Sequence, residues 1–303
     1  SVSLQNHFEA PGGVVRALLR ALRPHQWSKN LLVLVPVLAA HISLAPTLLG
    51  AALLAFMAFS LAASSAYVLN DLLDLEADRR HPRKRLRPFA SGALALGHGF
   101  WLAPALLGAS VAIGLHLPPE FMLILGTYLM LTLAYSFCLK RIVLLDAITL
   151  SGLYGVRILA GSAAVGVAVS SSMLAFALFI FLSLAMLKRF TELDAARSPD
   201  GRVVKLRAYE GEDRLLLLAL GGASGYLSVA VLAQYINSET ARSLYSTPEV
   251  MWLACPLLLY WISHAWLLAH RGQMHDDPVV FAATNRTSQC IIGLVFLTLL
   301  CAL

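Results

Sequence analysis

The chain has 303 residues, of which 58% are hydrophobic and only 13% are charged, and its formal net charge is +6. Soluble proteins carry about 25% charged residues, and a soluble core of this size could not bury so much apolar surface. The composition therefore excludes an ordinary soluble domain and predicts an all-α protein that crosses a membrane several times. The four cysteines lack C-x-x-C spacing, which argues against a disulfide framework or a zinc site.

The first thirteen residues are polar and lack the basic-then-apolar order of a secretory signal peptide. The sequence starts at Ser1 rather than at a methionine, so the existence of a preceding domain is an open question. Residues 14–22 are amphipathic and predict a helix that lies along the membrane interface. We therefore predict a cytoplasmic N-terminal segment over residues 1–26 and a transmembrane domain over residues 27–303.

Nine apolar runs predict membrane-spanning helices, since a helix of about 20 residues crosses the bilayer. The first run is short for a span. The predicted spans are Asn30–Leu44, Thr47–Leu69, Leu96–Leu115, Phe121–Leu139, Val143–Gly161, Ser172–Leu187, Leu215–Ile236, Met251–His270 and Ser288–Leu303.

The basic residues predict the orientation of these spans. Of the 23 Lys and Arg, all except Arg157 and Arg242 lie on one side, in alternate connections or ahead of the first span. The positive-inside rule makes that side cytoplasmic, with the N-terminus inside and the C-terminus outside. The two longest charged connections follow the second and sixth spans. We therefore predict an integral protein of the plasma membrane whose active site faces the cytoplasm.

The strongest local signal follows the second span, where four side chains carry oxygen: Asn70, Asp71, Asp74 and Asp78. On a helix, positions 70, 74 and 78 recur every four residues and share one face, with Asp71 beside it. Oxygen ligands suit a hard cation, and Mg²⁺ usually takes one or two carboxylates together with substrate phosphates. Six basic residues between positions 79 and 87 could neutralise such a diphosphate, although they could also belong to a solvated cytoplasmic loop. We predict a site for Mg²⁺ and a diphosphate.

The pattern N-D-x-x-D-x-x-x-D at the end of the second of nine spans resembles the signature of the UbiA superfamily of intramembrane prenyltransferases. This resemblance covers essentially the whole chain. It implies a helical bundle around a central cavity, capped by cytoplasmic loops, with Mg²⁺ ions that hold a diphosphate and a lateral opening for the lipid. Aromatic prenyltransferases of the superfamily carry a second motif, D-x-x-x-D, after the sixth span, whereas residues 188–194 here read K-R-F-T-E-L-D.

This departure resembles the branch that contains decaprenyl-phosphate phosphoribosyltransferases. Residues 23–30, which read R-P-H-Q-W-S-K-N, support the same branch, as do Tyr135 with Lys140 and Asp146 with Tyr154 and Arg157. The predicted catalytic residues are Asp74, Asp78, Lys188 and Arg189. The predicted metal ligands are Asn70, Asp71, Asp74 and Asp78. The predicted substrate-binding residues are Lys29, Asn70, Lys84, Arg87, Tyr135, Lys140, Tyr154, Arg157 and Glu192.

Several of these residues have plainer interpretations. Arg157 is the only basic residue inside a predicted span, where it would face a polar cavity and bind a phosphate, or pair with Asp146. Lys188 and Arg189 could anchor the end of the sixth span. Glu192, one turn later, could hold either of them or supply a metal oxygen. Residues 207–209 could fold over the site or be a solvated loop, and residues 275–277 predict a turn before Pro278.

The predicted reaction is a Mg²⁺-dependent transfer of 5-phosphoribose from phosphoribosyl diphosphate to a polyprenyl phosphate, with release of pyrophosphate. That reaction gathers more negative charge than prenyl transfer does, which fits a second motif with Lys188 and Arg189. The alternative is transfer of a polyprenyl group from its diphosphate to an aromatic or other acceptor. A transporter is a distant alternative. The expected partners are a diphosphate donor, a polyprenyl lipid and the bilayer of the cell envelope, without nucleic acid. Whether the protein forms a homo-oligomer is an open question.

Overall fold

The computed structural model describes residues 11–39, 46–80, 84–195, 208–274 and 278–303, and within these ranges the chain forms helices and connections without a β-sheet. The first half of the chain contains α1 (Pro11–Leu22), the 3₁₀ helix η1 (Pro24–Leu34), α2 (Val35–Ala39), α3 (Pro46–Leu73), α4 (Leu75–Arg80), η2 (Lys84–Leu86), α5 (Leu96–Gly114), α6 (Pro119–Phe137) and η3 (Leu139–Arg141). The second half contains α7 (Leu145–Val165), α8 (Ser171–Ala195), α9 (Asp213–Ile236), α10 (Glu239–Leu244), η4 (Pro248–Leu253), α11 (Ala254–His270), α12 (Pro278–Thr284) and α13 (Arg286–Ala302).

Seven helical segments are long and apolar enough to cross a membrane: Pro46–Leu73, Leu96–Gly114, Pro119–Arg141, Leu145–Val165, Ser171–Ala195, Asp213–Ile236 and Pro248–His270. They correspond to the second through eighth predicted spans. The ninth corresponds to α13, which is shorter, with 17 residues. The all-helical, membrane-spanning character is therefore confirmed, while the count of nine spans and the orientation remain predictions.

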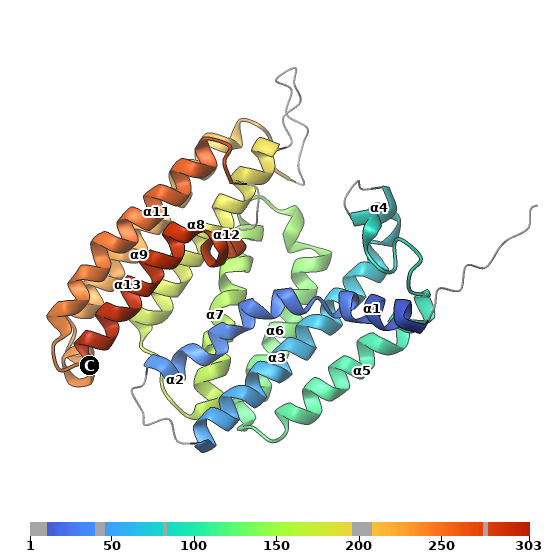
Figure 1. The fold of residues 1–303 in the computed structure, drawn as a ribbon, viewed down its shortest axis with the longest axis horizontal. Helices are drawn as coiled ribbons and strands as arrows, with labels where there is room; N and C mark the ends of the chain where they lie inside the picture. Colours follow the sequence, from blue (N-terminus) through green and yellow to red (C-terminus); the bar gives the residue numbers. More distant parts are fainter. Residues whose placement is uncertain (1–10, 40–45, 81–83, 196–207, 275–277) are drawn as a thin grey trace, which may run out of the picture.

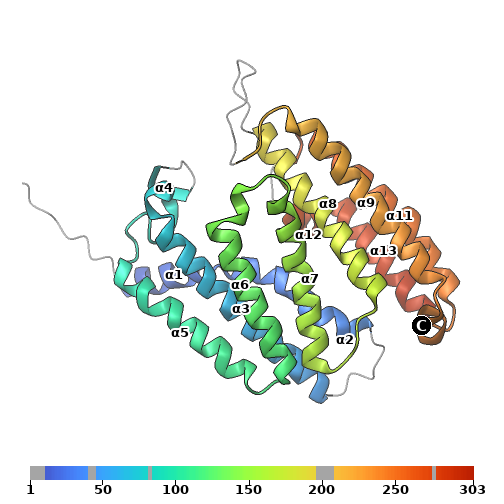
Figure 2. The ribbon, with the colours of Figure 1, turned by 180° about the vertical axis from the view of Figure 1, so that it is seen from behind.

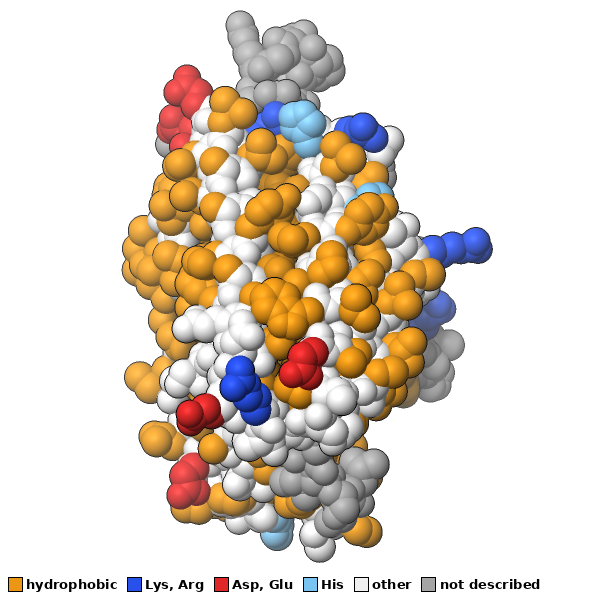
Figure 3. Space-filling view, turned by 90° about the vertical axis from the view of Figure 1, so that its left-hand side faces the viewer, with side chains coloured by type: hydrophobic (Ala, Val, Ile, Leu, Met, Phe, Trp, Pro, Cys, Tyr) orange, Lys and Arg blue, Asp and Glu red, His pale blue; other side chains and the backbone are white. Residues whose placement is uncertain are grey.

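The surface agrees with a lipid environment. On the face shown in Figure 3, hydrophobic side chains cover the broad middle, whereas charged side chains lie mainly toward the two ends and one edge. Large apolar side chains are strongly exposed on several long helices, for example Leu215 on α9 and Phe296 on α13. Such exposure is unfavourable in water but costs nothing against lipid tails.

The helices form two groups with α6 and α7 between them. Figures 1 and 2 show α1, α3 and α5 on one side of this pair and α8, α9, α11 and α13 on the other. α3 packs against α5, α8 packs against α9, and α7 contacts both α6 and α8. α3, α6 and α8 end, and α7 and α9 begin, at the end of the bundle that carries α4 (Figure 1), which we call the α4 end.

The first predicted span differs from the expectation. Its described part is the end of η1 and the short helix α2, while residues 40–44 lie outside the described residues. Pro36 lacks an N–H group and cannot donate a helical hydrogen bond, and the N–H of Val35 donates to Leu32 O in the tighter 3₁₀ pattern. η1 is fastened to α3 by two hydrogen bonds: Trp27 Nε1 donates to Ser64 Oγ (3.0 Å) and Asn30 Nδ2 donates to Ser60 Oγ (3.1 Å).

Small residues let the helices approach closely. A Cβ atom at Gly161 on α7 would lie 1.9 Å from Val33 O, so η1 passes directly over this glycine. Serine hydroxyls bridge other helix pairs: Ser151 Oγ donates to Leu178 O (2.6 Å) and Ser110 Oγ donates to Ala58 O (2.7 Å). Small and hydroxyl-bearing residues serve helix packing in membranes, because hydrophobic burial does not drive association there.

The C-terminal end of α8 bears on the site. α8 continues to Ala195, beyond the predicted end at Leu187, with Phe190 and Leu193 buried in its final turns. Lys188, Arg189 and Glu192 therefore lie on a helix rather than in a loop.

The predicted N-terminal helix is present as α1, which buries Ala17 and Ala21 and exposes Val15 and Leu19. Its position along the membrane interface and the segment boundary at residue 26 remain predictions.

Candidate active site

The acidic motif lies where α3 ends at the α4 end. Asp74 occupies the turn between α3 and α4, yet the helical hydrogen-bond path continues through it. Asp74 N donates to Asn70 O (2.9 Å), and Asp78 N donates to Asp74 O (2.8 Å). The backbone thus keeps the predicted succession of Asn70, Asp74 and Asp78 along one helical path.

Two arginines hold the buried carboxylates of this motif. Asp71 and Asp78 are each only 2% exposed. Arg87 Nη1 donates to Asp78 Oδ2 (2.5 Å) and to Asp71 Oδ1 (3.1 Å), so one guanidinium bridges both acids. Arg23 Nη2 donates to Asp71 Oδ1 as well (2.5 Å). The structure therefore joins Asp71, rather than Asn70, to Asp78.

Arg23 reaches Asp71 from a strained backbone. Its φ of 51° and ψ of 57° lie in the left-handed region, which costs a residue other than glycine about 1 kcal/mol or more. Its guanidinium also lies 5.2 Å from the centre of the Tyr67 ring. Strain of this kind persists where the surrounding contacts enforce it, and functional sites are the usual places.

Asp74 is the accessible acid of the motif. Its side chain is 46% exposed, and Lys140 Nζ lies 3.4 Å from Asp74 Oδ2. Lys140 belongs to η3, so this pair connects the turn after α6 to the acidic motif. Because both groups are reached by solvent, the pair itself stabilises the fold little and can exchange partners easily.

The donor atoms of the motif fit a divalent cation. Asp71 Oδ2 is buried and has no hydrogen-bond partner among the described residues. An unsatisfied buried carboxylate oxygen is costly, and a hard cation such as Mg²⁺ would satisfy it. Within the described residues no three acidic, His or Cys side chains converge on one point. A metal here would therefore bind one or two carboxylates and complete its shell with substrate oxygens or water.

A second polar cluster surrounds Arg189 near the end of α8. Arg189 is 1% exposed; its Nε donates to Asp146 Oδ2 (2.5 Å) and its Nη2 donates to Tyr135 OH (3.0 Å). Its Nη1 contacts Glu192, so the ion pair predicted as one alternative for Glu192 is present. The alternative pairing of Asp146 with Arg157 is wrong, because Asp146 binds Arg189 instead.

Tyr209, which precedes α9, completes this cluster. Its hydroxyl donates to Asp146 Oδ1 (2.5 Å) and accepts from Leu144 N (3.0 Å). Burial, followed by the neighbouring Asp146 carboxylate, raises the pKa of Tyr209 above its ordinary value of 10.0, so the phenol remains a donor. Leu144, with φ 63° and ψ −39°, is the second residue other than glycine with positive φ in the described ranges. Such a conformation costs about 1–3 kcal/mol.

Arg157 lies deeper in the bundle than the acidic motif. Its Nε donates to Asn30 Oδ1 (2.8 Å), and Asn30 in turn binds Ser60 on α3. Ser60 precedes Asp71 by eleven residues, which corresponds to roughly 16 Å along a helix axis. Arg157 also donates to Leu153 O (2.5 Å) and lies 4.9 Å from the centre of the Tyr128 ring. The contacts described for Arg157 thus link α7 to η1, and its predicted phosphate contact remains a prediction.

The remaining predicted residues are dispersed. Tyr154 stacks on Phe181 with ring centres 4.4 Å apart, and Arg157 lies 5.6 Å from its ring centre. Lys29 is half-buried on η1 and Lys188 is half-buried on α8. Lys84 begins η2 and is exposed, and residues 275–277 lie outside the described residues. Each of Lys29, Lys84 and Lys188 has an interaction partner.

Sequence reasoning missed several members of these clusters. Arg23 occurs in a pattern quoted above without a role of its own, and Asp146 was expected only as an alternative partner of Arg157 rather than of Arg189. Tyr128 OH accepts a hydrogen bond from Arg157 Nη2 (3.3 Å), and no sequence signal marks this tyrosine. Asn30, which starts the first predicted span and ends the pattern over residues 23–30, joins Arg157 to α3.

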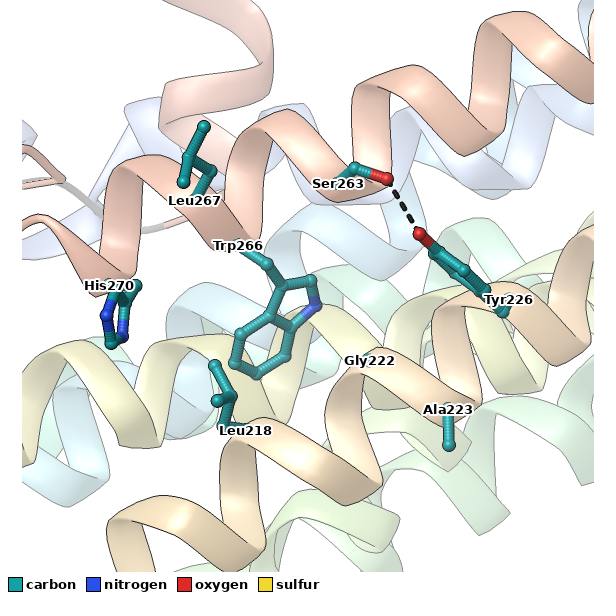
Figure 4. Close-up of a pocket in the computed structure, with 8 residues that line it drawn as sticks. All are labelled: Leu218, Gly222, Ala223, Tyr226, Ser263, Trp266, Leu267 and His270. Carbon is teal, nitrogen blue, oxygen red and sulfur yellow. Dashed lines mark hydrogen bonds between the residues drawn. The ribbon is translucent and has the colours of Figure 1, made fainter.

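A groove of about 470 Å³ lies elsewhere, between α9 and α11. Figure 4 shows Tyr226 and Ser263 facing each other across it, with their hydroxyl oxygens 2.9 Å apart, and Trp266 and His270 farther along. The side chains that line it include no carboxylate, Lys or Arg. A diphosphate needs charged donors, so this groove is not a candidate active site.

The sequence profile of the UbiA prenyltransferase family matches residues 32–287. The chain belongs to this family. It is therefore a UbiA-family transferase, and the acidic motif and the Arg189 cluster at the α4 end are the candidate active site of a UbiA enzyme.

Relatives of the UbiA chain carry different names. It is 37% identical to a decaprenyl-phosphate phosphoribosyltransferase of Mycolicibacterium smegmatis, over 93% of this chain and 90% of that protein. It is 38% identical to the nodulation protein NoeC of Azorhizobium caulinodans, over 90% and 89%. It is 37% identical to protein y4nM of Sinorhizobium fredii over 93% of this chain, but the match spans only 55% of y4nM.

The fold is also that of known UbiA structures. A UbiA homologue from Archaeoglobus fulgidus bound to GPP and Mg²⁺ aligns with a TM-score of 0.67, over 93% of this chain and 99% of that one. The two sequences are 16% identical, so this likeness concerns the fold alone.

Proposed function

We propose that this UbiA transferase moves 5-phosphoribose from phosphoribosyl diphosphate to a polyprenyl phosphate, in a Mg²⁺-dependent reaction that releases pyrophosphate. The observation that carries the proposal is the 37% identity to a decaprenyl-phosphate phosphoribosyltransferase over nearly the whole length of both chains. The acidic motif supports it as well, because Arg23, Arg87 and Lys140 lie beside its carboxylates and could bind phosphate oxygens.

The acidic motif would receive the diphosphate of the donor. One or two of Asn70, Asp71, Asp74 and Asp78 would supply oxygens for Mg²⁺, and Asp71 Oδ2, which has no hydrogen-bond partner among the described residues, would be the best available ligand. A bound Mg²⁺ would offset the negative charge that develops on the departing pyrophosphate.

The basic residues around the motif would bind the same diphosphate. Arg23, Arg87 and Lys140 already lie against the carboxylates, at 2.5 to 3.4 Å. A donor bound here would meet N–H groups that are in place before it arrives, which favours stabilisation of the leaving group. Lys84 and Lys188 would add positive charge at the same end of the bundle.

The chemistry needs no general base. The bond between the anomeric carbon and the diphosphate oxygen breaks, and its electron pair leaves with pyrophosphate. An oxygen of the lipid phosphate, already ionised near neutral pH, forms the new bond to that carbon. Tyr135, which accepts a hydrogen bond from Arg189, would donate one to a substrate oxygen. The protein's task is to hold two anionic substrates together.

The same proposal implies an orientation of the protein in the membrane and a route for its substrates. The basic α4 end would face the cytoplasm, where a water-soluble phosphoribosyl diphosphate is available, and the lipid phosphate would enter from the plasma membrane. Lys29 and Tyr154 would line the path of the substrates, and Arg157 would hold η1 against α7 along that path.

A side-by-side assay of donors tests this function. Purified protein in nanodiscs receives Mg²⁺, labelled phosphoribosyl diphosphate and decaprenyl phosphate, and we expect label to enter the organic phase. The Asp78→Asn variant and a reaction without the lipid phosphate serve as controls. Absence of transfer with polyprenyl phosphates of several lengths would contradict the proposal.

The second candidate is prenyl transfer from a polyprenyl diphosphate to an aromatic or other acceptor, which membership of the UbiA prenyltransferase family favours. The same preparation with a labelled prenyl diphosphate and candidate acceptors decides between them. Acceptor-dependent release of pyrophosphate from that donor alone would favour this candidate.

A further inference from the structure

Four parts of the chain meet at Asp146. The carboxylate lies at the start of α7 and is fully buried. It binds Arg189 on α8, 43 residues away, and Tyr209 in the connection to α9, 63 residues away. Through Arg189 it also reaches Tyr135 on α6. We call this set the Asp146 network: Tyr135, Leu144, Asp146, Arg189 and Tyr209.

Each carboxylate oxygen of Asp146 is already occupied. Oδ2 accepts from Arg189 Nε (2.5 Å), while Oδ1 accepts from Tyr209 OH (2.5 Å) and from Ala147 N (2.7 Å). A buried carboxylate with three donors is a poor metal ligand and a poor base, because binding a metal or a proton would displace these donors. The Asp146 carboxylate is therefore suited to hold Arg189 and Tyr209 in place.

Tyr209 ties the network to a strained backbone. The Tyr209 hydroxyl donates a hydrogen bond to Asp146 Oδ1 and accepts one from Leu144 N (3.0 Å), so one oxygen atom makes both contacts. Leu144 has positive φ, a conformation that persists only when its surroundings enforce it. Leu144 also immediately precedes α7, the helix on which Asp146 lies. Removing the hydroxyl would release the carboxylate contact and the backbone contact together.

The network is connected to the candidate donor site through the end of α6 and through η3. Arg189 Nη2 donates to Tyr135 OH (3.0 Å), and Lys140, five residues after Tyr135, contacts Asp74 of the acidic motif. A shift of Arg189 would therefore move Tyr135 relative to a donor held by Asp71, Asp74 and Asp78.

We infer that Asp146 and Tyr209 are positioning residues, which fix Arg189 and Tyr135 opposite the acidic motif during transfer. This inference rests on the proposed site at the α4 end, but it does not depend on which donor the enzyme uses. The donor is held by the acidic motif, so loss of positioning lowers the rate of transfer and leaves donor affinity nearly unchanged.

The test compares Tyr209→Phe with Tyr245→Phe. Tyr245 is also a buried tyrosine, but it lies between α10 and η4, at the end of α9 opposite Tyr209. Two quantities are measured in nanodiscs: hydrogen exchange at the Leu144 amide, and kcat and KM for whichever donor, phosphoribosyl or prenyl diphosphate, the wild-type enzyme turns over.

We expect Tyr209→Phe to speed exchange at Leu144 by at least about tenfold and to lower kcat by at least about tenfold, with donor KM changed less than about threefold. Asp146→Asn should reproduce the kcat loss, and Tyr245→Phe should change neither quantity. The inference is overturned by unchanged exchange at Leu144, by an unchanged kcat, or by a loss that lies wholly in KM. Lack of transfer from phosphoribosyl diphosphate would count against the proposed function but would leave this test intact.

Discussion

Gly161 on α7 lies under η1, and an alanine at this position should separate the two elements. The added Cβ would lie 1.9 Å from Val33 O and 3.1 Å from Pro36 Cδ, whereas ordinary contact begins at 3.4 Å. Relief of the clash with the carbonyl requires a displacement of about 1.5 Å. Half of that displacement at Asn30 would stretch its 2.8 Å hydrogen bond to Arg157 to the limit of 3.5 Å.

The expected effects follow from this geometry. Overpacking of this kind lowers the free energy of unfolding by about 1–3 kcal/mol. Because Arg23 precedes η1 and contacts Asp71, a shift of about 1 Å should also lower kcat/KM by up to about 100-fold. Thermal unfolding in nanodiscs and the transfer assay measure the two effects.

Gly155→Ala is the matched control, since it changes the same helix in the same way. No atom lies within 4 Å of a Cβ at Gly155. An alanine there should leave activity intact and raise stability by up to about 1 kcal/mol. Equal unfolding temperatures and equal activities for Gly161→Ala and Gly155→Ala would refute the packing of η1 on α7.

Three further predictions concern the active site and its surroundings. Asp71→Asn and Asp78→Asn should lower kcat/KM by at least about 100-fold, equivalent to about 2.7 kcal/mol, and should raise the Mg²⁺ concentration needed for activity. The control Glu76→Gln changes an exposed acid and should alter neither quantity. A Mg²⁺ titration after chelation measures both effects. Tyr226→Phe removes the hydrogen bond across the groove between α9 and α11 and should change activity less than about twofold; a larger loss would mean that the groove serves catalysis. Burial and Asp146 raise the pKa of Tyr209 above its unfolded value of 10.0, so its contribution to stability is present below about pH 10 and is lost as pH rises further. Alkaline unfolding of wild-type protein and Tyr209→Phe should therefore differ most below pH 10, and the difference should shrink as pH rises from 10 toward the raised folded-state pKa; identical profiles would contradict the buried contact.

Local sequence patterns predicted the helical membrane fold and the position of the acidic motif. Long apolar runs mark α3, α5, α6, α7, α8, α9 and α11, because lipid imposes nearly the same requirement on each of them. Asp74 and Asp78 follow directly from the end of such a run, and their spacing along a helix is a local property. The reach of α8 beyond Leu187 was missed, since the charged side chains in its last turns are satisfied by partners distant in sequence.

Contacts between distant residues could not be predicted in this way. Arg23 meets Asp71 across 48 residues, and Arg189 meets Asp146 across 43. Spacing carries no information about such pairs. The left-handed backbone of Arg23 and the positive φ of Leu144 are likewise imposed by tertiary contacts, because neither residue type favours that conformation.

The most direct test of the account is the location of the metal in a crystal grown with Mn²⁺ and phosphoribosyl diphosphate. We expect an anomalous peak at coordination distance, about 2.0–2.2 Å, from Asp71 Oδ2, with the diphosphate in contact with Arg23 or Arg87. A metal and diphosphate bound away from the end of α3, with both arginines still paired to Asp71, would contradict it.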